Sequence, residues 1–305
     1  MPSKKTLNIV LALLAGFSVR FWVDAEPEIQ TGLSIFVVAA WLWVSEALHI
    51  SVTALLIPIL AVLSGLFSVG EAVANFANPI IFLFMGGFAL AAALQKYQLD
   101  QAFAARILSL SAGRPMRAIL LLFLTTAFLS MWISNTATVA MMLPLALSLL
   151  HQPEGKTPPS LYLFVLLGLA YSGNLGGIAT LIGSPPNAIA AAQMGLNFRD
   201  WLGWGVPMFL LLFPIMVLVL FLLLRPRFGS TLNFAYRPHP IDRPRFTVLL
   251  IFALTACGWL LSAPLSAWLG IDSGFDSLVA MLAVVLLTGS RSLSFEEFVA
   301  KTNWG

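Results

Sequence analysis

Nine long apolar runs follow one another along this chain of 305 residues, separated by short polar links. Only 10% of the residues are charged, whereas a soluble domain usually carries about 25% charge. Each run is expected to be a helix, because a helix satisfies its own backbone hydrogen bonds in lipid. We therefore predict an all-α, polytopic membrane protein. The runs cover approximately residues 7–23, 31–48, 52–68, 79–95, 118–150, 161–198, 202–224, 246–263 and 275–289.

Composition excludes several classes of function. Cys257 is the only cysteine, so the chain has neither an internal disulfide nor a thiolate metal site. The net charge is only +3, and no soluble domain gathers it into a basic patch, so no nucleic-acid partner is expected. We find no phosphate-binding glycine loop and no credible Ser/His/Asp arrangement, which argues against an enzyme. Lys4 and Lys5 before an apolar run could mark a signal peptide, but the many similar runs favour a first membrane span.

Residues 118–150 are too many for one comfortable span and too few for two. Lys and Arg concentrate in cytoplasmic loops, so Lys4 and Lys5 place the N-terminus inside. A single crossing by 118–150 would put the five arginines of 225–245 outside. A re-entrant helical hairpin keeps them cytoplasmic, and two very short spans would do the same. We predict the hairpin, with its tip near Ser134, in a multi-pass protein of the inner (plasma) membrane.

A second run, 161–198, is too long for a plain span. Its 38 residues would extend about 57 Å as one helix, against about 30 Å of hydrocarbon. The sequence Gly-Ser-Pro-Pro-Asn interrupts it at 183–187. Pro185 and Pro186 lack amide hydrogens and clash with the preceding turn of a helix. We predict a broken helix whose two pieces are joined by an unwound link at 183–187.

The two interruptions carry the polar chemistry of the apolar region. Hydroxyl and amide groups fill the hairpin tip at 134–138, although neither 118–150 nor 161–198 contains a charged residue. Such groups are costly in hydrocarbon unless something satisfies them. Oxygen ligands suit a hard cation such as Na⁺, and helix N-termini attract anions. Broken helices with both features mark binding sites in secondary transporters. The alternative is that these residues, with Gly173 and Gly177, only pack helices together.

Two motifs resemble a known family. Ser-Asn-Thr at 134–136 followed by Gly-Ser-Pro-Pro-Asn at 183–187 is similar to the divalent anion:sodium symporter (DASS) family, which includes the sodium-dependent dicarboxylate transporters. Supporting stretches are WVSEALHISVTALLIP at 43–58 and NPIIFLFMGGFALAAALQKYQLD at 78–100. The resemblance covers the chain from about residue 30 onward. It implies a homodimer that works by an elevator-type movement, with a re-entrant hairpin bearing the Ser-Asn-Thr motif.

The resemblance also implies which residues bind. The implied sodium ligands are Ser130, Ser134, Asn135 and Gly183. The implied contacts to a substrate carboxylate are Asn135, Thr136, Ser184 and Pro185. Asn135 would thus link the cation and the anion.

The chain departs from the family in three ways. His49 stands where the family usually has Pro, and Ser184 replaces a commoner Thr while keeping the hydroxyl. The family has two inverted repeats, each with a Ser-Asn-Thr, and only one is present here. The final KTNWG resembles the start of the second repeat, so we expect an amino-terminal fragment. We divide it into scaffold helices at 1–117, part of a transport domain at 118–224, and a cytoplasmic basic linker with further scaffold helices at 225–305.

The sequence therefore predicts sodium-coupled symport of small divalent anions, most simply C4-dicarboxylates such as succinate or malate. Na⁺ is the expected coupling ion, and no organic cofactor is expected. The expected partners are the dianion, the lipid bilayer and a second copy of the chain. Two alternatives stay open: a sodium-independent exchanger of dicarboxylates, sulfate or citrate, and a truncated relic that does not transport.

Overall fold

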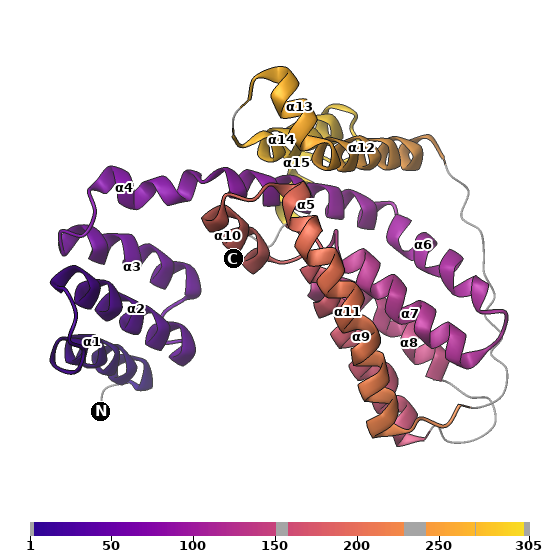
Figure 1. Cartoon of the computed structure of the whole chain (residues 1–305), viewed down its shortest axis with the longest axis horizontal. Coiled ribbons are helices and arrows are strands. Elements are labelled where there is room, and N and C mark those ends of the chain that lie inside the picture. The colour runs from indigo at the N-terminus through magenta and orange to yellow at the C-terminus, as the bar shows by residue number, and fades with distance from the viewer. Residues whose placement is uncertain (1–2, 151–157, 229–241, 272, 302–305) are drawn as a thin grey trace. The chain divides into compact units, whose positions relative to one another are not determined.

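The computed structural model describes residues 3–150, 158–228, 242–271 and 273–301 (Figure 1). Within these ranges the chain is helical and contains no strand, which confirms the predicted all-α class. The helices fall into two compact units, and the boundary lies between Asn78 and Pro79. The division into scaffold and transport parts is functional and stays a prediction.

The first unit contains four α-helices and a short 3₁₀ turn: α1 (Lys4–Trp22), α2 (Pro27–Ser45), α3 (Ile50–Leu63), α4 (Val69–Ala74) and η1 (Asn75–Ala77). The second unit contains the remaining elements: α5 (Pro79–Lys96), α6 (Leu99–Leu108), η2 (Ser109–Ser111), α7 (Pro115–Ser130), α8 (Asn135–Leu150), α9 (Pro159–Ile178), α10 (Pro185–Met194), α11 (Phe198–Leu224), α12 (Arg243–Leu260), α13 (Ser262–Leu269), α14 (Phe275–Gly289) and α15 (Phe295–Lys301).

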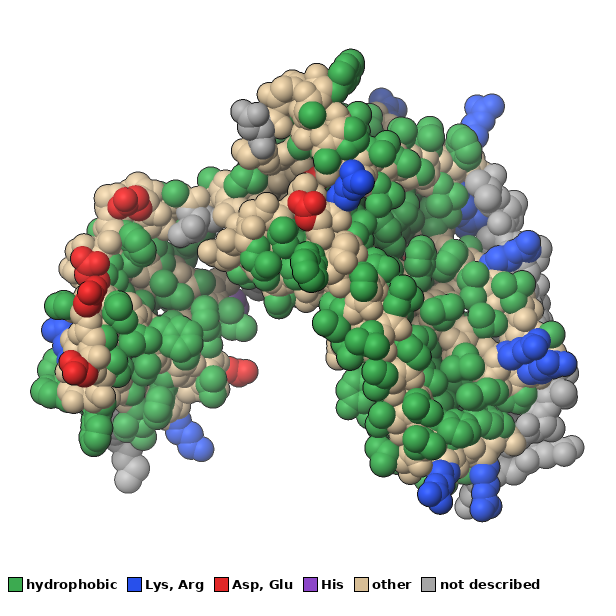
Figure 2. Space-filling model, viewed as in Figure 1, with side chains coloured by type: hydrophobic (Ala, Val, Ile, Leu, Met, Phe, Trp, Pro, Cys, Tyr) green, Lys and Arg blue, Asp and Glu red, His purple; other side chains and the backbone are tan. Residues whose placement is uncertain are grey.

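Several helices have the length and composition of membrane spans. Six stretches of the described chain are long and apolar enough to cross a bilayer, and four shorter apolar helices accompany them. Figure 2 shows hydrophobic side chains over most of the visible face of the region formed by α9 and α11, with Lys and Arg side chains gathered at one end. Exposed apolar side chains are expected where the solvent is lipid. The predicted multi-pass membrane architecture is therefore confirmed.

Residues 115–150 form a helical hairpin. Helix α7 ends at Ser130 and α8 begins at Asn135, so the turn occupies residues 131–134. Of the polar cluster predicted at the tip, only Ser134 lies in the turn, and residues 135–138 form the start of α8. The two arms are 16 residues each. Each arm is therefore about 24 Å long, which is shorter than a full crossing of the hydrocarbon core.

The second run is broken, but not where the prolines suggested. Helix α9 ends at Ile178 and α10 begins at Pro185, so the interruption covers residues 179–184. Pro185 and Pro186 thus belong to the first turn of α10 and not to the unwound link. The prediction of a link at 183–187 was wrong in position, because proline stabilises the first turn of a helix, where its missing amide hydrogen costs nothing.

Small residues let α9 lie directly against the hairpin. A Cβ on Gly176 would stand 2.1 Å from the carbonyl oxygen of Ala127 in α7, and one on Gly173 would stand 2.6 Å from a methyl group of Val139 in α8. The backbones can approach this closely only because both positions are glycine. Gly173 of the Gly-x-x-x-G pair therefore does pack helices, as one interpretation of the sequence held, and Gly176 joins it. This packing also brings the last turns of α9 to the hairpin tip.

Aromatic side chains fix the tip from the other side. Trp132 in the turn packs edge-on against Phe252 of α12, with ring centroids 4.9 Å apart. It also stacks on Phe198 at the start of α11, at 6.4 Å, and Phe198 stacks on the fully buried Trp259 at 5.0 Å. These contacts join the tip to the buried core formed by α5, α10, α12 and α14.

Candidate functional site

The hairpin tip and the last turns of α9 bring several oxygen atoms together. The hydroxyl of Ser130, which is fully buried, lies 2.6 Å from Asn135 Oδ1 and 2.7 Å from the carbonyl oxygen of Gly173. Ser130 is the last residue of α7 and Asn135 the first of α8, so the turn itself places the two side chains together. A serine hydroxyl carries one hydrogen and can donate it to only one of these two acceptors.

The Asn135 amide extends this cluster to the broken helix. When the amide is turned so that its nitrogen points inward, that nitrogen lies 2.6 Å from Ser130 Oγ and 3.3 Å from the carbonyl oxygens of both Gly173 and Gly183. In the opposite orientation the amide oxygen points into the same cluster, which then consists of oxygen atoms from Ser130, Asn135, Gly173 and Gly183. The oxygens of Ser130, Gly173 and Gly183 thus lie within 3.3 Å of the inward amide atom of Asn135, and uncharged oxygens of this kind suit a hard cation as ligands.

Two buried side chains hold the break in this position. The hydroxyl of Thr180 donates to the carbonyl of Met131 in the hairpin turn at 2.5 Å and accepts from the Gly183 N–H at 3.1 Å. The Asn187 amide donates to the carbonyl oxygens of Gly177 and Thr180 at 2.6 and 2.8 Å. Thr180 therefore ties the break to the hairpin, while Asn187 satisfies carbonyls left open at the end of α9.

Gly177 leaves the space in which the Asn135 amide lies. A Cβ built on Gly177 would stand 2.4 Å from Asn135 Oδ1 and 3.0 Å from Nδ2. Real Cβ atoms do not approach other atoms so closely, and the carbonyl oxygen of Gly177 is itself held by Asn187. The Asn135 amide can therefore occupy this position only because residue 177 is glycine.

Three of the sequence-predicted ligands come together, and the other predicted residues are more exposed. Ser130, Asn135 and Gly183 meet in the cluster described above. The side chain of Ser134 is exposed, and its hydroxyl accepts from the Ala137 N–H at 3.4 Å, so it caps the start of α8. Thr136 and Pro185 are exposed and Ser184 is half-buried. They lie at the starts of α8 and α10, next in sequence to the clustered residues.

The two helix starts differ in what they offer an anion. Pro185 and Pro186 occupy the first two positions of α10 and have no amide hydrogens to donate. The Asn187 N–H is directed to the carbonyl of Ser184 at 3.1 Å. Donors near this point must therefore come from the start of α8 and from the side chains of Asn135, Thr136 and Ser184.

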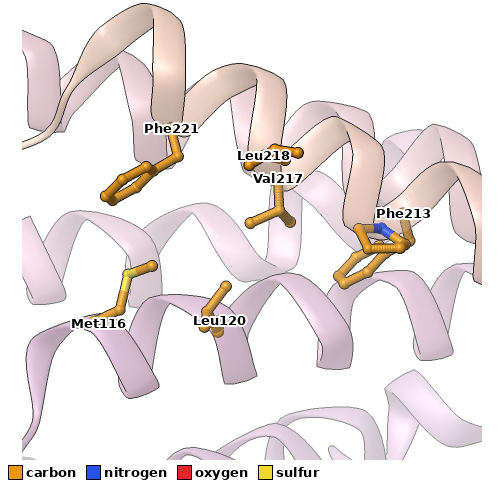
Figure 3. A pocket seen from close by; sticks show the side chains of 7 residues that line it. Met116, Leu120, Phe213, Val217, Leu218 and Phe221 are labelled. Atoms are coloured by element: carbon orange, nitrogen blue, oxygen red, sulfur yellow. The ribbon is translucent and has the colours of Figure 1, made fainter.

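The described surface carries apolar grooves. One of about 400 Å³ lies between α7 and α11 and is lined only by apolar residues. In Figure 3 the side chains of Met116 and Leu120 face those of Val217 and Phe221 across it. Such a surface suits lipid chains. Among the described residues no three His, Cys, Asp or Glu side chains group together as a metal site would require.

Sequence reasoning missed Gly173 and Thr180 as parts of the site. Gly173 contributes a backbone carbonyl, for which no residue type is a signal, and Thr180 acts through bonds to backbone atoms across the break. The available signal for Thr180 was a hydroxyl three residues before Gly183 in a run without charge.

Comparison with known proteins places the chain among transporters. The sequence profile described as citrate transporter (CitMHS) matches residues 40–305. The chain is 40% identical over 309 aligned positions to an uncharacterized transporter of Haemophilus influenzae, covering 99% of this chain and 67% of that protein. It is 42% identical over 280 positions to one of Methanocaldococcus jannaschii, covering 92% of this chain and 63% of that protein.

A further relative has a more specific name. The chain is 30% identical over 297 positions to the sodium-dependent dicarboxylate transporter SdcS of Staphylococcus saprophyticus, covering 86% of this chain and 56% of that protein. The chain thus spans between about half and two thirds of the length of these relatives. The match to the family profile extends over most of the chain and includes both the hairpin and the broken helix. This protein belongs to the citrate transporter (CitMHS) family of membrane transporters.

Proposed function

We propose that this protein carries out sodium-coupled symport of small divalent anions, with C4-dicarboxylates such as succinate or malate as the substrates. The observation that supports this most strongly is the cluster of oxygen atoms from Ser130, Asn135, Gly173 and Gly183 at the junction of a helical hairpin and a broken helix. The cluster contains no carboxylate, which favours a weakly held monovalent cation over Ca²⁺. The relative named as a sodium-dependent dicarboxylate transporter agrees with this chemistry.

The anion is proposed to bind beside the sodium ion, in contact with Asn135, Thr136, Ser184 and Pro185. Residues 118–150 and 161–198 contain no Lys or Arg that could balance two negative charges. A bound Na⁺ supplies that charge, and beside the fully buried Ser130 the attraction between the two ions is stronger than in bulk solvent. The anion therefore binds well only when the cation is in place. This order of affinities is the physical basis of coupling.

The larger-scale features of the proposal follow the same family. The hairpin is proposed to be re-entrant from the cytoplasmic side, with the N-terminus in the cytoplasm and with Arg225 and Arg227 after α11 on that side. The whole protein is proposed to be a homodimer that moves the hairpin and α9–α11 past scaffold helices in an elevator-type movement. The family description favours citrate as a second candidate substrate.

Uptake by proteoliposomes tests the proposal. The purified protein is reconstituted, and entry of radiolabelled succinate is followed with an inward gradient of Na⁺ or of choline. We expect succinate to accumulate above its external concentration with Na⁺ only. Equal uptake in choline, especially if it requires unlabelled dicarboxylate inside the vesicles, would establish sodium-independent exchange and refute symport. Sulfate and citrate as competitors rank the substrates.

A further inference from the structure

The amide of Asn135 can turn either its oxygen or its nitrogen toward the cluster without moving from its place, and each orientation suits a different state of the site. With the nitrogen inward, the amide can donate toward Ser130 Oγ and the carbonyl oxygens of Gly173 and Gly183. With the oxygen inward, Oδ1 meets Ser130 Oγ at 2.6 Å, and the only hydrogen available there is also within reach of the Gly173 carbonyl at 2.7 Å. The nitrogen then lies outward, 3.5 Å from Oδ1 of the exposed Asn174.

The absence or presence of a cation decides which orientation is favoured. Without a cation the inward oxygen adds an acceptor to a group of acceptors, which leaves oxygen atoms close together and unsatisfied. The inward nitrogen supplies the missing hydrogens, so it is the stable form of the sodium-free site. With Na⁺ present the amide hydrogens would face a positive charge, and the oxygen is needed as a ligand. The amide must then present its oxygen inward.

The same rotation changes what the amide offers on its open side. In the sodium-free form the oxygen points outward, and an oxygen there repels a carboxylate. In the sodium-bound form the nitrogen points outward and can donate a hydrogen bond to a carboxylate. We infer that rotation of the Asn135 amide by about 180° couples the two ligands: sodium binding turns the amide, and the turned amide is the donor that receives the anion. This inference deepens the proposed function and rests on it.

The rotation makes the affinity for the anion depend on sodium more strongly than charge balance alone would. If only the charge of the cation mattered, the anion would bind weakly without sodium but would meet the same groups. Rotation of the amide removes a hydrogen-bond donor and substitutes an acceptor at the same place, so the anion without sodium loses an attraction and meets a repulsion. A ligand shifts such an equilibrium only through its different affinity for the two states. Here both ligands prefer the same state, with the oxygen inward.

Hydrogen exchange of the side-chain amide gives a test with a distinctive sign. The full chain is labelled with ¹⁵N-asparagine, placed in lipid nanodiscs and observed by NMR, and the Asn135 signal is assigned by its loss in Asn135→Asp. We expect exchange of the Asn135 NH₂ hydrogens to become at least tenfold faster when NaCl replaces choline chloride, because the nitrogen leaves its three acceptors. Adding succinate should slow exchange again. Ligand binding ordinarily slows exchange, so this order is diagnostic.

Asn187 is the internal control. Its amide donates to two carbonyl oxygens in a buried setting and has no part in the rotation, so its exchange should stay slow in both salts. An Asn135 signal that is unchanged or better protected in NaCl, while NaCl still raises the melting temperature, would overturn the rotation alone. No effect of NaCl on either the melting temperature or the spectrum would overturn sodium binding and the inference together.

A substitution at Asn135 provides a second test of the amide rotation. Asn135→Asp keeps oxygens for the cation, but it replaces the amide hydrogens with a carboxylate, whose negative charge also repels the anion. We expect NaCl to stabilise this variant at least as much as the parent protein, whereas succinate affinity in NaCl should fall at least tenfold. Parent-like succinate affinity in Asn135→Asp would contradict the inference, because no donor remains at this position.

Discussion

Gly177→Ala is expected to raise the sodium concentration for half-maximal succinate uptake by about 100-fold, the cost typical of displacing a binding group by about 1 Å. The new methyl carbon would stand 2.4 Å from Asn135 Oδ1, so the amide must leave the cluster that includes Ser130 and Gly183. The helix itself should not suffer, since alanine favours a helix over glycine by about 1 kcal/mol. Sodium-dependent uptake and the melting temperature, measured together, separate the two effects.

Gly203→Ala is the matched control for this variant. Gly203 also lies inside a helix, α11, but a Cβ built there meets no atom within 4 Å. Its sodium dependence should equal that of the parent protein. If Gly177→Ala behaved like Gly203→Ala, the Asn135 amide would have no part in holding sodium.

Thr180→Val should weaken both the site and the fold around it. Valine matches threonine in shape but removes the donor to the Met131 carbonyl and the acceptor for the Gly183 N–H, at a position that is only 2% exposed. Each buried group left unsatisfied costs about 1–3 kcal/mol. We expect a lower melting temperature and at least a tenfold rise in the sodium requirement, because the Gly183 carbonyl is no longer held at the hairpin.

Thr180→Ser supplies the comparison. Serine keeps the hydroxyl and loses one methyl group, so its sodium requirement should return to within about threefold of the parent value even if the melting temperature stays somewhat lower. A sodium requirement raised equally by Ser and Val would mean that the methyl group, and not the hydroxyl, positions the break.

The hairpin could be predicted from the sequence, because polar side chains interrupt a long apolar run at its turn. Ser134 of the Ser-Asn-Thr at 134–136 is the last residue of the turn, while Asn135 and Thr136 begin α8, and the arms followed from the length of the run. The broken helix was recognised for the right reason but misplaced, since Pro185 and Pro186 disfavour a helix interior yet favour its first turn. Helix α6 carries Asp100 and Arg106 and was absent from the apolar runs, because its polar residues conceal a short helix.

The site could be predicted only in part. The sequence predicts Ser130, Asn135 and Gly183 as ligands, and in the structure these three residues meet. The carbonyl of Gly173 and the link through Thr180 depend on how α9 crosses the hairpin, and side-chain identity does not encode that crossing. Gly176 and Gly177 show why. Gly176 leaves space for the backbone of Ala127, and Gly177 leaves space for the amide of Asn135, so neighbouring glycines contribute to helix packing and to the site.

The central claim is that oxygen atoms at the hairpin tip hold a sodium ion and that this ion brings in the dianion. Equilibrium binding of radiolabelled succinate to the purified protein, at constant ionic strength with NaCl replaced stepwise by choline chloride, measures it directly. We predict that succinate affinity rises at least tenfold with sodium, and that succinate raises sodium affinity by the same factor, as thermodynamic linkage requires. Equal succinate affinity in choline and in sodium would contradict the claim.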